Sequence, residues 1–387
     1  MFIKCLRVLS LFLIFSLILA GCSQIDEDAV KEHSTTFSPG NIPDQLLEDV
    51  ENKRAVIVGE VHGSKEHQYI LADFVKALHN NGELDAVILD ARHAFGWIIE
   101  DYTRGAIEEG VYVRDVLSRR WEFFQKIREY NEDLPEEEKL IIRAGDINFH
   151  HDQFLTSLQY MRNYIEEREA LNMFLNRLRT SVDRESVLRE FKNDLEEKDI
   201  FTGTGPADWD ERILRIIEVE LKSREPREKW QTNYSEAHRM REEVLKDIVS
   251  YELNDGHEIV LNYGFNHAQK RHHFGTEKKW LGEYLTQNHP LSSNRTFSLV
   301  FVPLKGRLNT GEGQVEEINL LEDPPDNDLI STAARIIGSD SYSYLFLDER
   351  AFGENEVKMR FPWQTVEAVP KEIYDGFIFI PEVTPGN

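Results

Sequence analysis

The sequence predicts an α/β protein with a mostly parallel central sheet flanked by helices, and with a large helical insertion. Two observations predict this class. Short apolar runs that fit strands alternate with longer runs that have the apolar spacing of helices, as is typical of a parallel sheet. Residues 152–253 then show a helical pattern without a good strand, although a crossover between parallel strands needs only about twelve residues.

The N-terminus has the pattern of a secretory signal, predicted over residues 1–21. Lys4 and Arg7 precede an apolar run that is too short for a membrane span. The letters LAGC at 19–22 resemble the lipobox of bacterial lipoproteins. The resemblance implies cleavage before Cys22, a lipid on its thiol, and an extracytoplasmic place on the cell membrane. Ordinary secretion is the alternative.

The chain carries 45 basic and 70 acidic residues, a formal net charge of −25. Such a surface disfavours nucleic acid and anionic lipid headgroups as partners. The two cysteines, Cys5 and Cys22, fall in the signal and at the lipid site, so no disulfide is expected and the core must hold the fold. Residues 22–50 are polar and are predicted to be an acidic tether, with a possible helix from Asp44.

Residues 51–387 are predicted to form the α/β domain. Its first strand, 55–58, is rich in β-branched residues and stops at Gly59. Ser64 is a candidate N-cap for a helix over 64–79, whose apolar residues recur at helical spacing. Further strands are expected at 86–89, 140–143, 257–263 and 296–304, with strand-like pieces at 342–348 and 376–383. Residues 95–131 are expected to be helical, and the insertion is expected to break at 202–208 and Pro226.

Polar residues follow four of the expected strands. In an open parallel sheet, ligands bind outside the carboxyl ends of the strands. We therefore expect these side chains to meet at one edge, although each alone could be a cap, a turn residue or a structural ion pair. The strands end in Glu60 and His62, in Asp90 and Arg92, in Asp146, and in Asn266 and His267.

This set of residue types can activate water against an ester, lactone or amide bond. A histidine can take the proton, a carboxylate can fix its tautomer, and an arginine can stabilise an oxyanion. The same groups could instead hold a divalent metal, with His62, His267, Glu60 and Asp146 as possible ligands. No Gly-x-Ser-x-Gly elbow, dinucleotide fingerprint, Walker loop or His-Glu-x-x-His occurs.

The letters GEVH at 59–62 and GFNH at 264–267 are two Gly-x-x-His motifs, each after an expected strand. The pair resembles the hallmark of the superfamily that contains Tiki/TraB, ChaN-like and erythromycin-esterase proteins. The order of further segments, at 119–151, 238–270, 280–285 and 374–385, is similar to the erythromycin-esterase family. The resemblance implies a hydrolase of a small-molecule substrate, in which His62 is the general base on water.

In that resemblance Glu60 and Asp90 orient the base or hold a metal, and His267 faces it. Arg239 and Glu122 match family positions that line the cleft. The sequence departs from the family in its shorter Glu60-Val61-His62 spacing, in the aspartate that ends strand two, and in lacking an arginine near residues 69–71. These departures weaken the case for a macrolide substrate.

Two other functions fit the sequence. A ChaN-like lipoprotein would bind haem or iron, and haem needs an exposed histidine or tyrosine in an apolar setting. Tyr69, His67 and Tyr263 are the candidate haem ligands. A non-catalytic cell-surface protein that keeps the fold is the third hypothesis.

Overall fold

The computed structural model describes residues 25–198, 200–202, 208–272, 279–311 and 314–386. Its centre is an eight-stranded sheet with the order β1-β9-β12-β6-β2-β5-β3-β4. The six strands from β12 to β4 run parallel to one another, and β9 is antiparallel to both β1 and β12. The predicted mostly parallel sheet is confirmed. The strands are β1 (Ser34–Phe37), β2 (Ala55–Glu60), β3 (Ala86–Arg92), β4 (Ile141–Asp146), β5 (Ile259–Gly264), β6 (Thr296–Pro303), β9 (Tyr342–Phe346) and β12 (Gly376–Ile380).

The central strands are buried on both faces, as parallel sheets require. Every residue of β2, β6 and β12 is buried, which explains why these segments are mostly apolar rather than alternating between apolar and polar residues. Two small ribbons lie outside the sheet, β7 (Lys305–Gly311) with β8 (Gln314–Asn319) and β10 (Val357–Phe361) with β11 (Gln364–Ala368).

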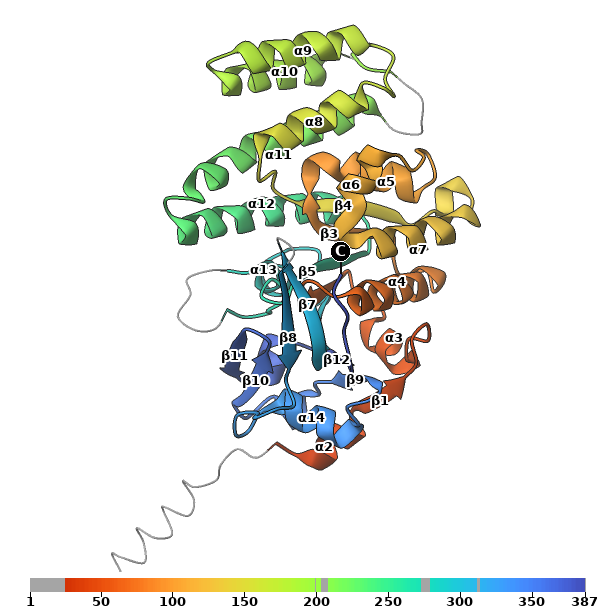
Figure 1. Cartoon of the computed structure of the whole chain (residues 1–387), viewed down its shortest axis with the longest axis vertical. Coiled ribbons are helices and arrows are strands. Elements are labelled where there is room, and N and C mark those ends of the chain that lie inside the picture. Colours follow the sequence, from red (N-terminus) through yellow and green to blue (C-terminus); the bar gives the residue numbers. More distant parts are fainter. Residues whose placement is uncertain (1–24, 199, 203–207, 273–278, 312–313, 387) are drawn as a thin grey trace, which may run out of the picture.

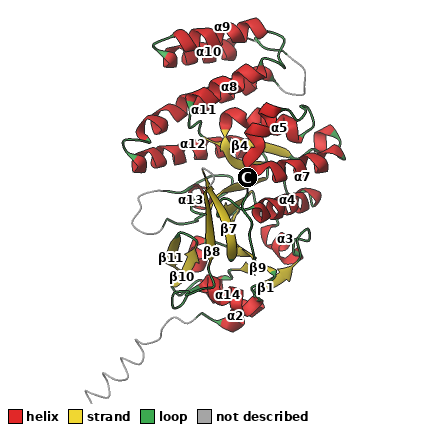
Figure 2. Ribbon diagram, viewed as in Figure 1, coloured by secondary structure: helices red, strands yellow, loops and turns green. Residues whose placement is uncertain are grey.

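Helices surround the sheet (Figure 2). The helix predicted over 64–79 is α4 (Lys65–Asn80), and Ser64 caps it by accepting a hydrogen bond from the His67 backbone. The helical stretch predicted over 95–131 is interrupted around two glycines. It contains η1 (His93–Phe95), α5 (Gly96–Thr103), α6 (Val111–Leu117), η2 (Ser118–Arg120) and α7 (Trp121–Glu132). The remaining short helices are η3 (Glu136–Glu138), α13 (Leu281–Gln287), α14 (Leu329–Ile337), α15 (Glu349–Phe352) and α16 (Pro370–Ile373).

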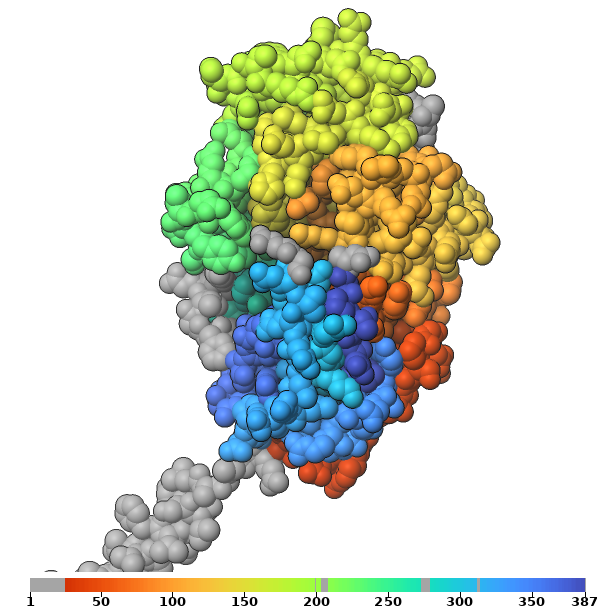
Figure 3. Space-filling model, viewed as in Figure 1, coloured from red at the N-terminus to blue at the C-terminus, as the bar shows by residue number. Residues whose placement is uncertain are grey.

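The long segment between β4 and β5 is the predicted helical insertion. Helices α9 (Arg168–Thr180) and α10 (Arg184–Glu197) form one end of the described molecule, and α14 and α2 (Glu27–Glu32) lie together at the other (Figures 1 and 3). The expected break at Pro226 is wrong, because Pro226 lies inside α11, near its C-terminal end. The insertion contains α8 (His151–Met161), α9 (Arg168–Thr180), α10 (Arg184–Glu197), α11 (Trp209–Lys229) and α12 (Tyr234–Asn254).

The prediction of a tether over residues 22–50 needs a correction. Residues 27–50 form α2 (Glu27–Glu32), β1 and α3 (Asp44–Val50), and β1 pairs with β9 at the sheet edge. Val30 and Leu46 are fully buried, so these apolar side chains fix the segment to the core despite its polar composition. The signal peptide and Cys22 lie outside the described residues. Within the described ranges, no helix has the length and apolar character to span a membrane.

The fold brings the four polar strand ends together. β2, β5, β3 and β4 are consecutive neighbours and run parallel, so their carboxyl ends share one edge of the sheet. Glu60 lies opposite Gly264 in the register of β2 and β5, and Arg92 lies opposite Asp146 in that of β3 and β4. The chain leaves β2 toward β3 and later returns through β5 toward β6, so this edge contains a topological switch point.

Candidate functional site

The turn after β2 holds Glu60 and His62 together. Oε1 of Glu60 lies 2.6 Å from Nδ1 of His62. The Glu60 side chain is 8% exposed, whereas that of His62 is 55% exposed. Because the ionised carboxylate only accepts hydrogen bonds, Nδ1 carries the proton in the neutral ring and Nε2 is left as the acceptor.

Two further side chains hold the Glu60 carboxylate. Arg120, at the end of η2, donates to its two oxygens at 2.8 and 3.3 Å. Nε2 of His67, in α4, lies 3.1 Å from Oε2. Burial alone would raise the pKa of Glu60, but the charge of Arg120, together with the neighbouring histidines, holds it well below its usual range. Glu60 is therefore a fixed negative charge behind His62.

The pKa values of His62 and His67, the two histidines beside Glu60, are shifted in opposite directions. Partial desolvation opposes protonation of His62, but the hydrogen bond to Glu60 and the charges of Glu60 and Asp90 outweigh it and raise its pKa. Oδ2 of Asp90 lies 3.9 Å from Nε2 of His62. His67 is fully buried, and burial lowers its pKa to about 4. His62 is therefore the ring that exchanges protons, and His67 stays neutral.

Asp90 and Asp146 form a buried carboxyl pair around Arg241 of α12. Arg241 binds both oxygens of Asp146, at 2.7 and 2.8 Å, and Oδ1 of Asp90 at 3.2 Å. Burial and the Asp90 charge raise the pKa of Asp146 to about 7, against the pull of Arg241. Burial opposes ionisation of Asp90 too, but Arg241 and His62 lower its pKa to about 2. Asp90 is therefore the more acidic carboxyl of the pair.

The two Gly-x-x-His motifs interlock, and each glycine makes room for the other motif. A Cβ atom on Gly59 would lie 2.8 Å from Cα of Phe265, in the second motif. A Cβ atom on Gly264 would lie 3.0 Å from Nε2 of His62 and 3.7 Å from Cδ2 of His267. The rings of His62 and His267 thus flank the same backbone position, as the motif pair predicts.

His267 has its own carboxylate. Its Nδ1 atom lies 2.7 Å from Oε1 of Glu242, a fully buried residue of α12, and its ring meets Trp280 edge-on at 5.4 Å. Burial would raise the pKa of Glu242, but His267 and Arg241 lower it. The site therefore repeats one arrangement twice, with a buried glutamate behind each motif histidine.

Not every predicted residue belongs to this cluster. Arg239 lies on the exposed side of α12 and pairs with Glu236 at 2.7 Å, so its assignment to the cleft is wrong. Glu122 lies 4.0 Å from Lys65, at the start of α4, and makes no described contact with His62. Arg92 lies at the shared edge, half-buried, and its guanidinium makes no hydrogen bond or ion pair with any described residue.

The strand-end pattern does not predict Arg120, Arg241 or Glu242, nor the contact of His67 with Glu60. A signal for Arg241 is present in the sequence. Arg241 shares the buried face of α12 with Ala237, Leu245 and Ile248, which recur at helical spacing. Three further charged residues are buried on this helix, Glu242, Lys246 and Glu252. No comparable pattern marks Arg120, which follows Arg119 in a short η2 segment.

The candidate ligands do not fit a divalent metal. Arg120 binds the carboxylate of Glu60, and Arg241 binds those of Asp90 and Asp146. A metal ion held by these carboxylates would therefore lie beside two guanidinium groups, whose positive charges repel it. The described residues also contain no group of three or more His, Cys, Asp or Glu side chains placed to hold a metal ion.

The candidate haem ligands also do not form a site. His67 and Tyr263 are buried, and the Tyr263 hydroxyl donates to the Gly145 carbonyl at 2.8 Å. Tyr69 is 36% exposed on α4, with Lys126 above its ring. The three side chains therefore offer no shared apolar surface to a porphyrin.

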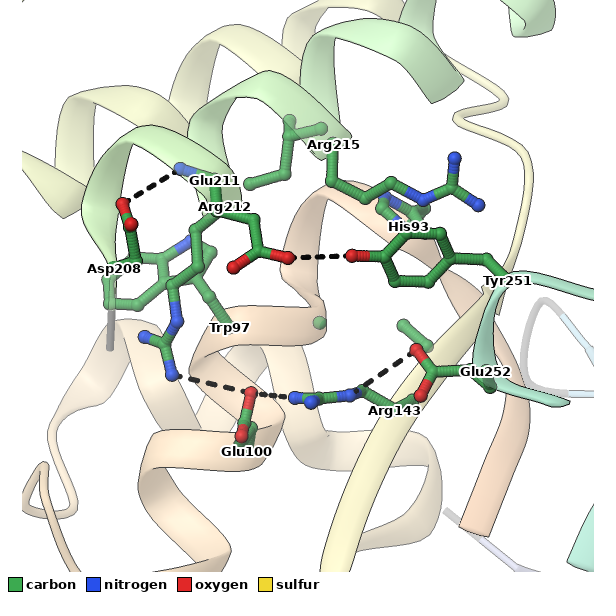
Figure 4. Close-up of a pocket in the computed structure, with 13 residues that line it drawn as sticks. His93, Trp97, Glu100, Arg143, Asp208, Glu211, Arg212, Arg215, Tyr251 and Glu252 are labelled. Carbon is green, nitrogen blue, oxygen red and sulfur yellow. Dashed lines mark hydrogen bonds and ion pairs between the residues drawn. The ribbon is translucent and has the colours of Figure 1, made fainter. Parts of the chain in front are cut away.

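A cavity of about 320 Å³ lies elsewhere, between α5, α11, α12 and β4 (Figure 4). Polar and charged side chains that line this cavity form hydrogen bonds with one another. Tyr251 donates to Glu211 at 2.6 Å, and Arg212 donates to Glu100 at 3.3 Å. None of its lining residues belongs to the His62 cluster. We place the candidate site at His62 because an accessible imidazole and several groups with shifted pKa values converge there.

No protein-family model matches the sequence, and no curated protein matches it. Several solved structures have a similar fold. A protein from Bacillus cereus aligns with a TM-score of 0.72 at 12% identity, over 93% of this chain and 97% of that one. A structure described as a succinoglycan biosynthesis protein aligns with a TM-score of 0.70 at 13% identity, over 93% and 97%.

A mutant of the erythromycin esterase EreC, in its open conformation, aligns with a TM-score of 0.65 at 14% identity, over 92% of this chain and 98% of that one. At such identities the similarity concerns the fold and not the reaction. The chain therefore shares its α/β fold with an erythromycin esterase over nearly the whole length of both chains.

Proposed function

We propose that this protein is a hydrolase in which His62 activates water against an ester, lactone or amide. The observation that carries the proposal is the 2.6 Å contact between Glu60 and an imidazole that remains 55% exposed. The fold shared with an erythromycin esterase supports the same reaction class. The shorter spacing between Glu60 and His62 leaves the substrate open within this class.

The proton transfers follow from the tautomer of His62, in which Nδ1 carries the proton and Nε2 is free to accept one. Nε2 of His62 takes a proton from water as the water oxygen attacks the carbonyl carbon. Glu60 accepts the Nδ1 hydrogen bond and stabilises the imidazolium that forms, while Arg120 keeps Glu60 charged. The imidazolium then returns the proton to the leaving oxygen or nitrogen as the carbon–heteroatom bond breaks.

The second half of the site has a supporting role in this proposal. Asp90 lies 3.9 Å from Nε2 of His62, where it can accept a hydrogen bond from the attacking water. His267, backed by Glu242, faces the same space across Gly264 and can bind the substrate carbonyl or leaving group. Arg241 fixes Asp90 and Asp146, so it is a positioning residue.

We propose further that the chain is anchored by a lipid on Cys22 outside the cytoplasm. The lipobox-like letters at 19–22 support this. The first helix within the described residues begins at Glu27, five positions after Cys22, so a lipid on Cys22 would hold the domain close to the membrane.

The experiment for the hydrolase is a screen of p-nitrophenyl esters, lactones and amides with the purified wild-type protein and with His62→Ala. The proposal expects turnover by the wild type that is lost in the variant, with unchanged circular dichroism. Equal turnover by the two proteins would overturn it.

A further inference from the structure

Two arginines on segments that contact the His62 cluster make no ion pair with any residue in the described ranges. Arg92 ends β3 and is half-buried, and Arg119 is exposed within η2. Neither guanidinium makes a hydrogen bond or an ion pair with a side chain in the described ranges. The charge of the full chain makes this unusual, because acidic residues outnumber basic ones by 70 to 45, yet no acidic residue within the described ranges pairs with either arginine.

The backbone holds both arginines beside the catalytic groups. Arg119 directly precedes Arg120, which binds Glu60, and its carbonyl accepts a hydrogen bond from Gln68 of α4 at 3.0 Å. Arg92 lies opposite Asp146 in the strand register and two residues after Asp90. Both arginines are therefore attached to segments that contact the His62 cluster.

The nearby carboxylates are already engaged. Glu60 is bound by Arg120, and Asp146 is bound through both oxygens by Arg241. Burial and the charge of Arg119 lower the pKa of Arg92, and Asp146 offsets this only in part. The positive charge on these two neighbouring segments is thus only partly offset by Asp146, and binding of an anion would offset it further.

We propose that Arg92 and Arg119 form a subsite for an anionic group of the substrate, a phosphate or a carboxylate, next to His62. Guanidinium groups donate in a planar fork that matches the oxygens of both anions. If the protein is the proposed hydrolase, the subsite implies that its substrate carries an anionic group. Only this part of the inference rests on the proposed function. Anion binding itself can be measured without turnover.

The first experiment titrates inorganic phosphate, and separately acetate, into the wild-type protein by calorimetry. We expect saturable binding of at least one anion, and the tighter of the two identifies the group. Arg92→Gln and Arg119→Gln should each weaken this binding roughly tenfold, the loss expected for one charge-assisted contact. Arg92→Lys should retain part of it.

Arg239→Gln is the matched control, because Arg239 is an exposed arginine of α12 outside the cluster. It removes the same charge and should bind the anion as the wild type does. Binding of neither anion by the wild type would overturn the subsite, as would equal losses in Arg239→Gln and Arg92→Gln.

A second experiment compares hydrolysis of an ester that carries a free carboxylate with hydrolysis of its uncharged analogue. The wild type should prefer the charged ester in kcat/KM, and Arg119→Gln should reduce this preference roughly tenfold through KM. Turnover of both esters without a preference would contradict the subsite and leave the hydrolase standing. Anion binding without any turnover would contradict the hydrolase and leave the subsite standing.

Discussion

A methyl group on Gly264 would lie 3.0 Å from Nε2 of His62, so the second Gly-x-x-His motif limits the space of the base in the first. The two motifs are about two hundred residues apart in sequence, and the pairing of β2 with β5 brings them together. The glycine is therefore a steric requirement of the site rather than of a turn, since its φ angle is not positive.

Gly264→Ala should therefore lower kcat without unfolding the protein. The added methyl group displaces the His62 ring, and a misplacement of this kind can cost on the order of tenfold or more in rate. Gly110→Ala is the control, because nothing lies within 4 Å of a Cβ atom there and the φ angle of −140° suits alanine. Equal kcat values for Gly264→Ala and Gly110→Ala would show that the contact does not matter.

Glu60→Gln should shift the pH dependence of activity. The glutamate raises the pKa of His62, and the base must be neutral, so the wild-type kcat/KM should rise with pH through a midpoint above the ordinary histidine pKa of about 6.5. Without the carboxylate the midpoint should move to lower pH and the plateau rate should fall. Profiles of kcat/KM recorded between pH 5 and 9 test this. A midpoint that does not move would show that Glu60 does not set the pKa of the titrating base.

Arg241→Met should destabilise the protein by about 3–5 kcal/mol, because it leaves two buried carboxyl groups without their cation. Arg239→Gln, two residues away on the same helix, should change the free energy of unfolding by no more than about 0.5 kcal/mol. Urea unfolding of both variants measures the difference. Similar values would mean that Arg241 does not compensate the Asp90–Asp146 pair.

Cys22→Ser should abolish lipid modification and release the protein from the membrane fraction. The measurement is mass spectrometry of the mature N-terminus together with cell fractionation. A mature wild-type chain that begins at Cys22 and carries a lipid is expected. An unmodified wild-type cysteine would favour ordinary secretion.

The sequence predicts the sheet because its strands are buried on both faces and read as short apolar runs. The polar edge is also predictable, because neighbouring parallel strands end at the same edge of the sheet. The residues placed there are Glu60, His62, Asp90, Asp146 and His267. The N-terminal segment was misjudged because few apolar side chains, such as Val30 and Leu46, fix an otherwise polar stretch.

The cations of the site were harder to predict. Arg239 and Arg241 differ only in the face of α12 that they occupy, and the apolar spacing around Arg241 would have distinguished them. Arg119 and Arg120 are adjacent in a short helical turn without a periodic pattern, so only the structure separates the arginine that binds Glu60 from the one that does not.

The most direct test of the account is the rate of ester hydrolysis by His62→Ala, compared with the wild type and with His289→Ala. His289 is a buried histidine outside the cluster, so its variant controls for loss of an imidazole. If His62 is the general base, its removal should lower kcat by roughly 10²–10⁴-fold while the protein remains folded. A folded His62→Ala variant with the wild-type kcat would contradict the account.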